Sequence, residues 1–459
     1  MSKSQKRSCI ALVLAAGEGT RMKSTIPKVL HQVAGLAMVN HVVKAVAEAH
    51  VDCCAVVTGN QSDLVEQAIS GFNQQAEFFP QVQRLGTAHA VLAAESALAR
   101  GFDDVLVLFG DTPLLRPETL LQMRQCLADG ADVAVLGFHA DDPTGYGRLV
   151  EEDGRLVAIR EHKECSAEEL AIRFCNGGIM AINGAKCLEL VKSVSNNNSK
   201  GEYYLTDLAQ IANERGLKVV SHKGDELEIL GINNRVELAE AEQIWQQRRR
   251  RELMLDGVSM IAPHTVFLSH DTAIGVDTTL EPNQLFGPGV MIGKGVRIRG
   301  YCHFEQCNIG DDCDIGPYAR LRPGTAIAPK GKVGNFVEIK NAKIASGAKV
   351  NHLSYIGDAE IGEKANIGAG TITCNYDGVN KHLTRIGAGA FIGSNSALVA
   401  PVSIGENAYV GSGSVVTKNA PDDSLVVSRA RQTTMEGRAV ILKNKALAFK
   451  KAKSQKPSS

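Results

Sequence analysis

The sequence has little net charge, few aromatic residues and no close cysteine pair of the metal-binding kind. Its 459 residues include 50 basic and 50 acidic side chains, and aromatic residues make up 5% of the chain. General nucleic-acid binding needs a basic surface, and binding of single strands adds stacking aromatics. We therefore expect no nucleic-acid partner. The basic run 248–251 and the lysine-rich tail keep a non-enzymatic scaffold or nucleic-acid binder open as one alternative.

The eleven cysteines are scattered, and no Cys-X-X-Cys pair occurs among them. An odd number of unpaired thiols is typical of a reducing compartment. The basic N-terminus precedes only a short apolar run that glycines interrupt, which favours a strand over a secretory signal. No stretch approaches the length of a membrane span. We expect a cytoplasmic protein without a membrane partner.

Residues 14–30, LAAGEGTRMKSTIPKVL, resemble a phosphate-binding loop but fit neither common pattern. There is no third glycine at position 22 for GxGxxG and no Gly-Lys-Ser/Thr for a Walker loop. The run CIALVLA before it reads as a buried strand. In a parallel sheet, ligands bind beyond the carboxyl ends of the strands, so this loop belongs at that edge.

The first half alternates strand-like and helical patterns, which predicts a mostly parallel sheet covered by helices. The strand-like runs are CIALVLA, CCAVVTG, DVLVLFG and ADVAVLGF, and the helical runs include 37–49 and 87–99. Residues 235–253 contain no glycine or proline and predict one long helix joining two halves.

From Ile274 onward, aliphatic or aromatic residues recur every six positions. The first two registers run from Ile274 to Phe304 and from Ile309 to Ile339, and others follow to Val410. A hexapeptide period predicts a parallel β-helix. The segment 373–385 interrupts the period, so we expect it to leave the coil as a loop. The predicted boundaries are 1–234 for an α/β domain, 235–253 for a linker helix, 254–440 for the β-helix, and 441–459 for a basic, disordered tail.

The opening loop resembles that of sugar-nucleotide pyrophosphorylases. Further motifs in order are QRLGTAHA, FGDTPLL, DDPTGYGR, GEYYLTD and GINNR, then ARLRPG, VGNFVEIK, NHLSYIGDAEIG and NIGAGTITCNYDG. With a hexapeptide coil, this set resembles the bacterial family of bifunctional N-acetylglucosamine-1-phosphate uridylyltransferases and glucosamine-1-phosphate N-acetyltransferases. The resemblance implies a Rossmann-like nucleotidyltransferase domain, a left-handed coil and a homotrimer. It also implies acetyl-CoA and UTP as co-substrates, with UDP-N-acetylglucosamine, a precursor of cell-wall and lipopolysaccharide synthesis, as the product.

In the first half, the nucleophile is an already ionised sugar phosphate, so charge and alignment at the nucleotide dominate the barrier. Backbone N–H groups of Gly17 and Gly19 would hold phosphates, with Arg21 and Lys28 as catalytic cations. Mg²⁺ needs hard oxygen ligands. Asp111 supplies a carboxylate, and the resemblance implies that the side-chain oxygen of Asn233 is a second ligand. The resemblance assigns the remaining UTP and UDP-N-acetylglucosamine contacts to Leu14, Gln81, Gly86, Thr87, Gly147, Glu161 and Asn176.

In the second half, an ammonium must lose a proton before it can attack a thioester, and histidine has a suitable pKa. His352 matches the family's base, and Glu338 is a candidate to orient it. The resemblance assigns the sugar phosphate to Arg322, Lys340, Tyr355, Asn366 and Lys381. It assigns acetyl-CoA to Ala369, Asn375, Tyr376, Ser394, Ser412 and Arg429.

Two further alternatives are enzymes. One is a single-activity nucleotidyltransferase whose β-helix is structural or regulatory. The other is a metal hydrase, which needs three histidines on neighbouring coils around zinc. The coil offers His303, His352 and His382, which lie far apart in the sequence.

Overall fold

The computed structural model describes residues 7–152, 155–198 and 200–454, with side chains as far as Lys451. Its contacts divide the chain into two compact units. The first comprises residues 1–274 with 282–290, and the second comprises 275–281 with the chain from 291 onward.

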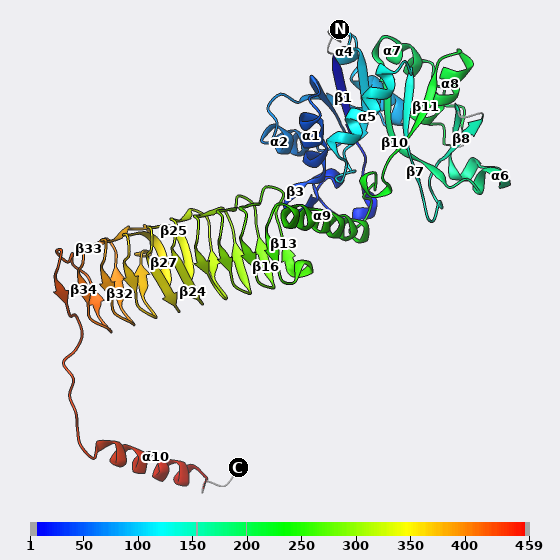
Figure 1. The fold of residues 1–459 in the computed structure, drawn as a ribbon. Coiled ribbons are helices and arrows are strands. Elements are labelled where there is room, and N and C mark those ends of the chain that lie inside the picture. The colour runs from blue at the N-terminus through cyan, green and yellow to red at the C-terminus, as the bar shows by residue number, and fades with distance from the viewer. Residues whose placement is uncertain (1–6, 153–154, 199, 455–459) are drawn as a thin grey trace. The chain divides into compact units, whose positions relative to one another are not determined.

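A mostly parallel sheet forms the centre of the first unit (Figure 1). Its strand order is β11-β7-β10-β6-β1-β4-β5, and only β10 in that path runs antiparallel to its neighbours. A hairpin of β8 and β9 pairs with β10. The strands are β1 (Cys9–Ala15), β4 (Cys53–Thr58), β5 (Glu77–Pro80), β6 (Asp104–Phe109), β7 (Val133–His139), β8 (Arg148–Glu152), β9 (Arg155–Arg160), β10 (Phe174–Asn183) and β11 (Val219–Lys223).

The central strand β1 is buried on both faces because helices cover each side of the sheet. Alternate residues Ala11 and Val13 belong to one hydrophobic cluster, and Ile10 and Leu12 belong to another. A strand buried on both faces reads as a continuous apolar run, as CIALVLA does. The helices are α1 (Met38–Glu48), α2 (Ser62–Ser70), α3 (Thr87–Ala93), α4 (Glu95–Leu98), α5 (Pro117–Ala128), α6 (Ala167–Leu170), α7 (Gly184–Lys192) and α8 (Leu208–Glu214).

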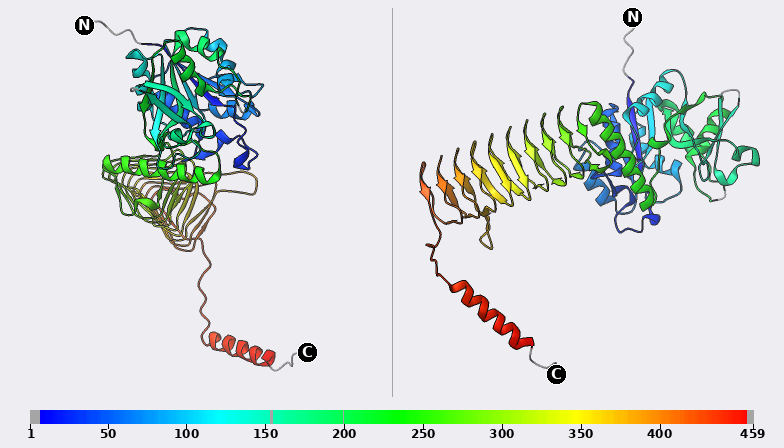
Figure 2. Two further views of the ribbon diagram at one scale, coloured as in Figure 1. Left: turned by 90° about the vertical axis from the view of Figure 1, so that its right-hand side faces the viewer. Right: turned by 60° about the horizontal axis from the view of Figure 1, so that its bottom comes forward.

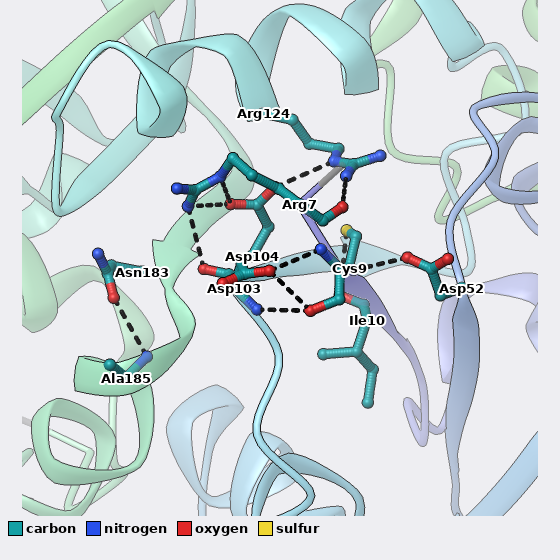
Figure 3. Close-up of polar contacts among 10 residues, drawn as sticks. Arg7, Cys9, Ile10, Asp52, Asp103, Asp104, Arg124, Asn183 and Ala185 are labelled. Atoms are coloured by element: carbon teal, nitrogen blue, oxygen red, sulfur yellow. Dashed lines mark hydrogen bonds and ion pairs between the residues drawn. The ribbon is translucent and has the colours of Figure 1, made fainter. Parts of the chain in front are cut away.

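At the amino ends of β1 and β6, a buried carboxylate ties three segments together (Figure 3). Asp104 is 1% exposed and accepts hydrogen bonds from Arg7 Nε at 2.9 Å and Arg124 Nε at 3.2 Å. A buried charge is tolerated when it is paired and hydrogen-bonded. These contacts fix the end of the sheet opposite the ligand edge.

The long helix predicted at 235–253 is α9 (Arg235–Leu255), which Asn234 caps by accepting from two backbone N–H groups. It is not a free linker, because its apolar side packs within the first unit. Ala241 joins a cluster with Met38 and Leu114, against which Trp245 also packs. The α/β unit therefore extends beyond the predicted boundary at residue 234.

The second unit is a parallel β-helix, whose stacked short strands are clear in Figure 2. Strands pair with those one coil later, as in the series Leu321, Ile339 and Ile356. Most hexad residues are buried, including Leu280, Ile298 and Phe304. The six-residue period thus places one side chain per hexad in the coil interior.

One ladder of the second unit contains β15 (Thr279–Leu280), β18 (Arg297–Ile298), β21 (Asp314–Ile315), β24 (Lys332–Asn335), β26 (Lys349–His352), β28 (Asn366–Ile367), β31 (Phe391–Ile392), β34 (Tyr409–Val410) and β36 (Leu425–Val426). The other two ladders share β25 (Glu338–Ile344) and β27 (Tyr355–Ile361). Their further members are β17 (Met291–Ile292), β19 (Cys302–Phe304), β20 (Cys307–Ile309), β22 (Arg320–Leu321), β23 (Thr325–Ile327), β29 (Ile372–Cys374), β30 (Thr384–Ile386), β32 (Ala397–Val399), β33 (Val402–Ile404) and β35 (Val415–Val416).

The structure corrects the bounds of the predicted loop and gives the local structure of the tail. The loop leaves the coil at 375–383, between β29 and β30, and is shorter than the predicted 373–385. The residues at both ends of the predicted loop stay in strands because Thr373 and Thr384 are buried in the coil. The described part of the predicted tail lies in helix α10 (Arg438–Ser454), whose side chains are exposed as far as Lys451. This segment is rich in alanine, leucine and lysine and lacks glycine and proline, which favours a helix.

Candidate active sites

A cavity of about 550 Å³ lies in the first unit at the carboxyl ends of the central strands. Its lining includes nine of the residues predicted for the nucleotide and its metal: Leu14, Gly17, Lys28, Gln81, Gly86, Thr87, Asp111, Glu161 and Asn176. The first loop and the end of β6 therefore meet at one site, as the parallel arrangement of β1 and β6 requires.

The polar centre of this cavity is a cluster around Lys28. Its Nζ donates to a carboxylate oxygen of Asp111 and lies 3.2 Å from Oδ1 of Asn233. Arg21 donates to the same amide oxygen at 2.9 Å. The cluster joins residues more than 200 positions apart and contains both predicted cations and both predicted metal ligands.

The oxygens of Asp111 and Asn233 fit a magnesium ion. A single cation, the Lys28 ammonium, already contacts both of them. Mg²⁺ is commonly held by one or two protein oxygens, with waters and substrate phosphates completing its shell. The described residues contain no group of three His, Cys, Asp or Glu side chains arranged for a metal. A two-ligand magnesium site is compatible with that finding.

The glycine-rich loop needs glycine at position 19 for a steric reason. Gly19 has φ of 63°, and a Cβ there would lie 2.4 Å from the Cβ of Lys28. The loop can therefore pack directly over the lysine only without a side chain at this position. An ion pair between Glu18 and Arg84 closes the outer side of the loop. Arg84 also lines the cavity and was absent from our predictions.

One side of the cavity presents an amide and a tight backbone turn. Gln81 is 7% exposed, and its Nε2 lies 3.3 Å from the Gly86 carbonyl and 3.2 Å from His89 Nδ1. Thr87 Oγ1 accepts from the Leu205 N–H at 2.9 Å. Gly86 has φ of 116°, and a Cβ there would lie 2.5 Å from the Tyr203 carbonyl oxygen. These contacts hold the Gln81 amide beside the turn.

The cavity also contains an acidic residue in a poorly solvated place. Burial raises the pKa of Glu161, and the nearby Glu164 adds to the effect. Asn176 receives a hydrogen bond from Gly178 N–H at 2.9 Å and donates its own N–H to the Gly147 carbonyl at 2.8 Å. Residues from the GEYYLTD segment and the lysine before it complete this wall, and we predicted none of them: Lys200, Glu202, Tyr204, Leu205 and Thr206. The motif itself was the signal that pointed to them.

In the second unit, five polar or small residues occupy one position on consecutive coils. Asn335 pairs with His352 in register, and the backbone hydrogen bonds that follow have the same pattern on each later coil. On each coil, the backbone N–H of the residue that follows the column residue donates to the carbonyl of the column residue one coil earlier. The column consists of Asn335, His352, Ala369, Ser394 and Ser412. It places the predicted base, the predicted oxyanion donor and two predicted coenzyme contacts along one edge of the coil.

His352 is exposed on this column, so it is not a core histidine of the coil. Its Nδ1 lies 2.7 Å from Oδ1 of Asn335. The prediction that Glu338 orients this ring is wrong, because Glu338 instead pairs with Arg322 NH1 at 2.8 Å. Glu338 lies on a different ladder, in register with Tyr355 rather than with His352. Asn335, which belongs to the VGNFVEIK motif but was not singled out, takes the orienting position.

Three of the predicted phosphate contacts are cations that lie close together. The pKa of Lys340 is lowered, first by its contact with Lys381 and the charge of that side chain, and then by Arg322. Like charges gathered without a matching number of anions form a natural site for a phosphate group. Tyr355 and Asn366 start β27 and β28, and Asn366 lies on a different ladder from Lys340. The described hydrogen bonds do not connect Asn366 to the cations.

The looped-out segment is tied to the coil at its first residue. Asn375 is 7% exposed and donates to Asp358, which also accepts from Asn341 Nδ2 at 2.6 Å. Within the loop, Asp377 accepts from two backbone N–H groups and from His382, which together hold its pKa well below the usual range. Tyr376 is exposed. Asn375 therefore belongs to the coil surface, and Tyr376 belongs to the loop.

Further along the coil, Arg429 NH1 donates to the Ser412 carbonyl at 2.6 Å. The three histidines required for a metal hydrase do not converge. His303 lies 3.8 Å from Glu305, His352 contacts Asn335, and His382 pairs with Asp377 at 2.7 Å. Separate partners for each imidazole exclude the zinc hydrase alternative within the described chain.

Comparisons with known proteins support this division of the chain. Residues 11–196 match the MobA-like NTP transferase domain family, and residues 383–418 match the bacterial transferase hexapeptide family of six repeats. The "Bifunctional protein GlmU" of Chelativorans sp. is 60% identical over 448 residues, covering 97% of this chain and 98% of that protein. Its counterpart in Rhizobium rhizogenes is 56% identical, covering 98% and 99% of the two chains.

The chain belongs to the bifunctional GlmU family. As a GlmU-family protein it is a bifunctional transferase, with a nucleotidyltransferase unit followed by a hexapeptide acyltransferase unit. The coil is accordingly consistent with the left-handed β-helix of hexapeptide transferases. No helix within the described ranges is long and apolar enough to span a bilayer. The cysteines are present as thiols in the described structure.

Proposed function

We propose that the protein acetylates glucosamine 1-phosphate with acetyl-CoA and then transfers UMP from UTP to the product. The final product is UDP-N-acetylglucosamine, and pyrophosphate is released. The observation that carries this proposal is the presence of two complete and different polar sets. Lys28, Asp111 and Asn233 form one in the first unit, and His352 with Asn335 forms the other in the second.

In the first unit, the sugar-phosphate oxygen attacks the α-phosphorus of UTP, and the bond to the pyrophosphate leaving group breaks. Arg21 and Lys28 would stabilise the negative charge on the phosphoryl oxygens in the transition state. Mg²⁺, held by Asp111 and Asn233, would neutralise the pyrophosphate. Gln81 and the Gly86–Thr87 turn would bind uracil, while Gly147, Glu161 and Asn176 would bind the sugar.

In the second unit, the free amine of glucosamine 1-phosphate attacks the acetyl carbonyl, and the carbon–sulfur bond to coenzyme A breaks. Asn335 Oδ1 can only accept, so Nδ1 of His352 carries the ring proton and Nε2 is free to remove a proton from the amine. The Ala369 N–H would stabilise the oxyanion. Arg322, Lys340 and Lys381, together with Tyr355 and Asn366, would hold the phosphate.

The coenzyme would lie along the later coils. Ser394 and Ser412 continue the column of His352, and Arg429 is fixed to the Ser412 carbonyl. Tyr376 would approach the acetyl group from the looped-out segment, and Asn375 would approach it from the coil. The single-activity alternative is not favoured, because a purely structural coil needs neither an exposed histidine nor a cluster of three cations.

A homotrimer is supported by the hexapeptide family match and by apolar side chains exposed on the coil, including Met291, Ile372 and Val415. Sedimentation equilibrium of the full chain would test it, and a stable monomer at working concentration would contradict it. The cysteine thiols support a cytoplasmic location.

The proposed function is tested by assaying the purified full chain with each substrate pair separately. Acetyl-CoA and glucosamine 1-phosphate should yield a free thiol, and UTP with N-acetylglucosamine 1-phosphate should yield pyrophosphate only when Mg²⁺ is present. Failure of the first assay alone would restore the single-activity alternative.

A further inference from the structure

A second cavity of about 420 Å³ lies in the first unit, away from the nucleotide site. It is bounded by α1, by the segment 113–118 and by the C-terminal half of α9. The two cavities share no lining residue. The mechanism described above uses no side chain of this second cavity.

Four cationic side chains line the second cavity: Lys44, Arg116, Arg248 and Arg249. Three of them have carboxylate partners. Lys44 lies 4.0 Å from Glu48, Arg249 lies 3.1 Å from Glu252, and Arg116 lies 3.2 Å from Glu228.

Arg248 differs from the other three cations. Its NH1 donates to the Leu114 carbonyl at 2.9 Å, and the described residues give it no ion pair. Burial lowers the pKa of its guanidinium, and the neighbouring charge of Arg116 lowers it further. The charges of Glu228, Asp225 and Glu252 offset part of this lowering, but none of the described ion pairs joins them to Arg248. A desolvated cation with a like charge beside it and no direct ion pair is unfavourable, and an anion bound between the two would relieve both effects.

The two imidazoles in the lining add little positive charge at neutral pH. His41 donates from Nε2 to the Val33 carbonyl at 2.8 Å, and burial lowers its pKa to about 4. Burial also lowers the pKa of His270. Three carboxylates, Glu48, Glu118 and Glu252, also line the cavity. Attraction for an anion therefore comes from the lysine and the arginines, which outnumber these carboxylates and whose charge persists across the physiological pH range.

We propose that this cavity is a binding site for a phosphate-type oxyanion, either free phosphate or a phosphate ester, held between Arg116 and Arg248 with Lys44 opposite. Arginine forks bind such groups through paired charge-assisted hydrogen bonds. The site is separate from the nucleotide site, although segment 113–118 begins just after Asp111 and α9 begins just after Asn233.

Trp245 makes this proposal directly measurable. It is the only tryptophan in the chain, and it lines this cavity. Titrating the full-length protein with inorganic phosphate at constant ionic strength should give a saturable change in its fluorescence. A parallel titration with methyl phosphate shows whether an esterified group is accepted as well.

Lys44→Gln and Arg248→Gln should each weaken the phosphate affinity about 10-fold, which is the expected effect of losing one charge-assisted contact. Arg251→Gln is the matched control, because Arg251 is exposed on the same helix and does not line the cavity. Arg21→Gln controls for phosphate in the nucleotide site. Both controls should leave the affinity unchanged.

The proposal is overturned if no saturable signal appears, or if Lys44→Gln binds as tightly as wild type. It is also overturned if Arg21→Gln abolishes the signal, since phosphate would then be acting from the nucleotide site. Thermal unfolding of each variant identifies loss of folding. Lys44 is partly exposed on α1 and keeps the test valid if Arg248→Gln disturbs the Leu114 segment.

Discussion

Nδ1 of His352 lies 2.7 Å from Oδ1 of Asn335, which occupies the equivalent position one coil earlier. The contact is made between neighbouring coils of one chain, so the fold itself fixes the ring. Because the amide oxygen only accepts, it selects the tautomer with a proton on Nδ1 and leaves Nε2 as the base. This arrangement supports the proposed base role of His352, which a ring packed inside the coil could not perform.

His352→Ala should lower acetyl transfer by roughly 10²–10⁴-fold, the range expected for loss of a general base. Uridylyl transfer should be unchanged because its residues lie in the other unit. The residual acetylation rate should increase with pH as the amine loses its proton to water. Turnover, acetyl-CoA affinity and melting temperature should be measured together. Loss of all three, with no rescue at high pH, would mean that the histidine only supports the coil.

Asn335→Ala should reduce the kcat of acetyl transfer about 10-fold while leaving the KM for acetyl-CoA unchanged, because the ring loses orientation rather than a substrate contact. Asn335→Asp places a carboxylate against the ring, which stabilises the imidazolium. The acidic limb of the pH–rate profile should then move to higher pH. Identical profiles for wild type and Asn335→Asp would contradict the orienting role.

Asp111→Asn should abolish most Mg²⁺-dependent uridylyl transfer and leave acetyl transfer intact. The substitution replaces a full charge with a dipole at a site for a hard cation and removes the carboxylate partner of Lys28. The pyrophosphate release rate, measured across a magnesium titration, provides the test, and acetylation by the same sample is its control. Wild-type turnover with UTP would place the metal elsewhere.

Lys381→Met should raise the KM for glucosamine 1-phosphate about 10-fold, because one of three clustered cations is removed from the phosphate site. The pKa of Lys340 should rise in this variant, since Lys381 is the main cause of its lowering. Lys418→Met, at an exposed lysine outside the predicted site, is the matched control. Equal KM values for the two variants would remove Lys381 from the sugar-phosphate site.

The first unit should lose stability as the pH falls from about 6.5 to about 4. Burial lowers the pKa of His41 to about 4 in the folded state, against an ordinary value of 6.5, so the unfolded chain binds more protons in this window. The contribution of the neutral His41 ring to the free energy of unfolding is fully present above pH 6.5. About 3 kcal/mol of it is lost by the time the pH has fallen below about 4. Urea unfolding followed by Trp245 fluorescence should show a weaker pH dependence in His41→Gln. Equal slopes would mean that the ring is protonated without penalty.

The sequence alone determined the architecture of both halves. The run CIALVLA predicted a strand buried on two faces, and β1 contributes alternate residues to two hydrophobic clusters. The hexapeptide period predicted the coil because one inward residue per hexad repeats at every corner. Local patterns of this kind carry enough information whenever the deciding interactions lie within a few residues or repeat along the chain.

The antiparallel strand β10 and the place of α9 were decided by tertiary contacts. Nothing in the local pattern of Phe174–Asn183 shows that it inserts between β6 and β7. The helix at 235–253 was visible in the sequence, but only packing of Trp245 and Ala241 against the first unit shows that it is not a free linker. The side chains that bury the apolar side of α9 come from segments far from it in the sequence.

At the sites, the sequence supplied the residue types and the fold supplied their partners. Lys28, Asp111 and Asn233 were each predicted, yet their meeting depends on three separate segments converging at one edge of the sheet. Glu338 was the wrong partner for His352, because sequence distance does not reveal which residues share a position on consecutive coils. Strand register gives that position to Asn335 and assigns Glu338 to Arg322 on a different ladder. Register depends on where each corner of the coil falls, and only the tertiary structure fixes it.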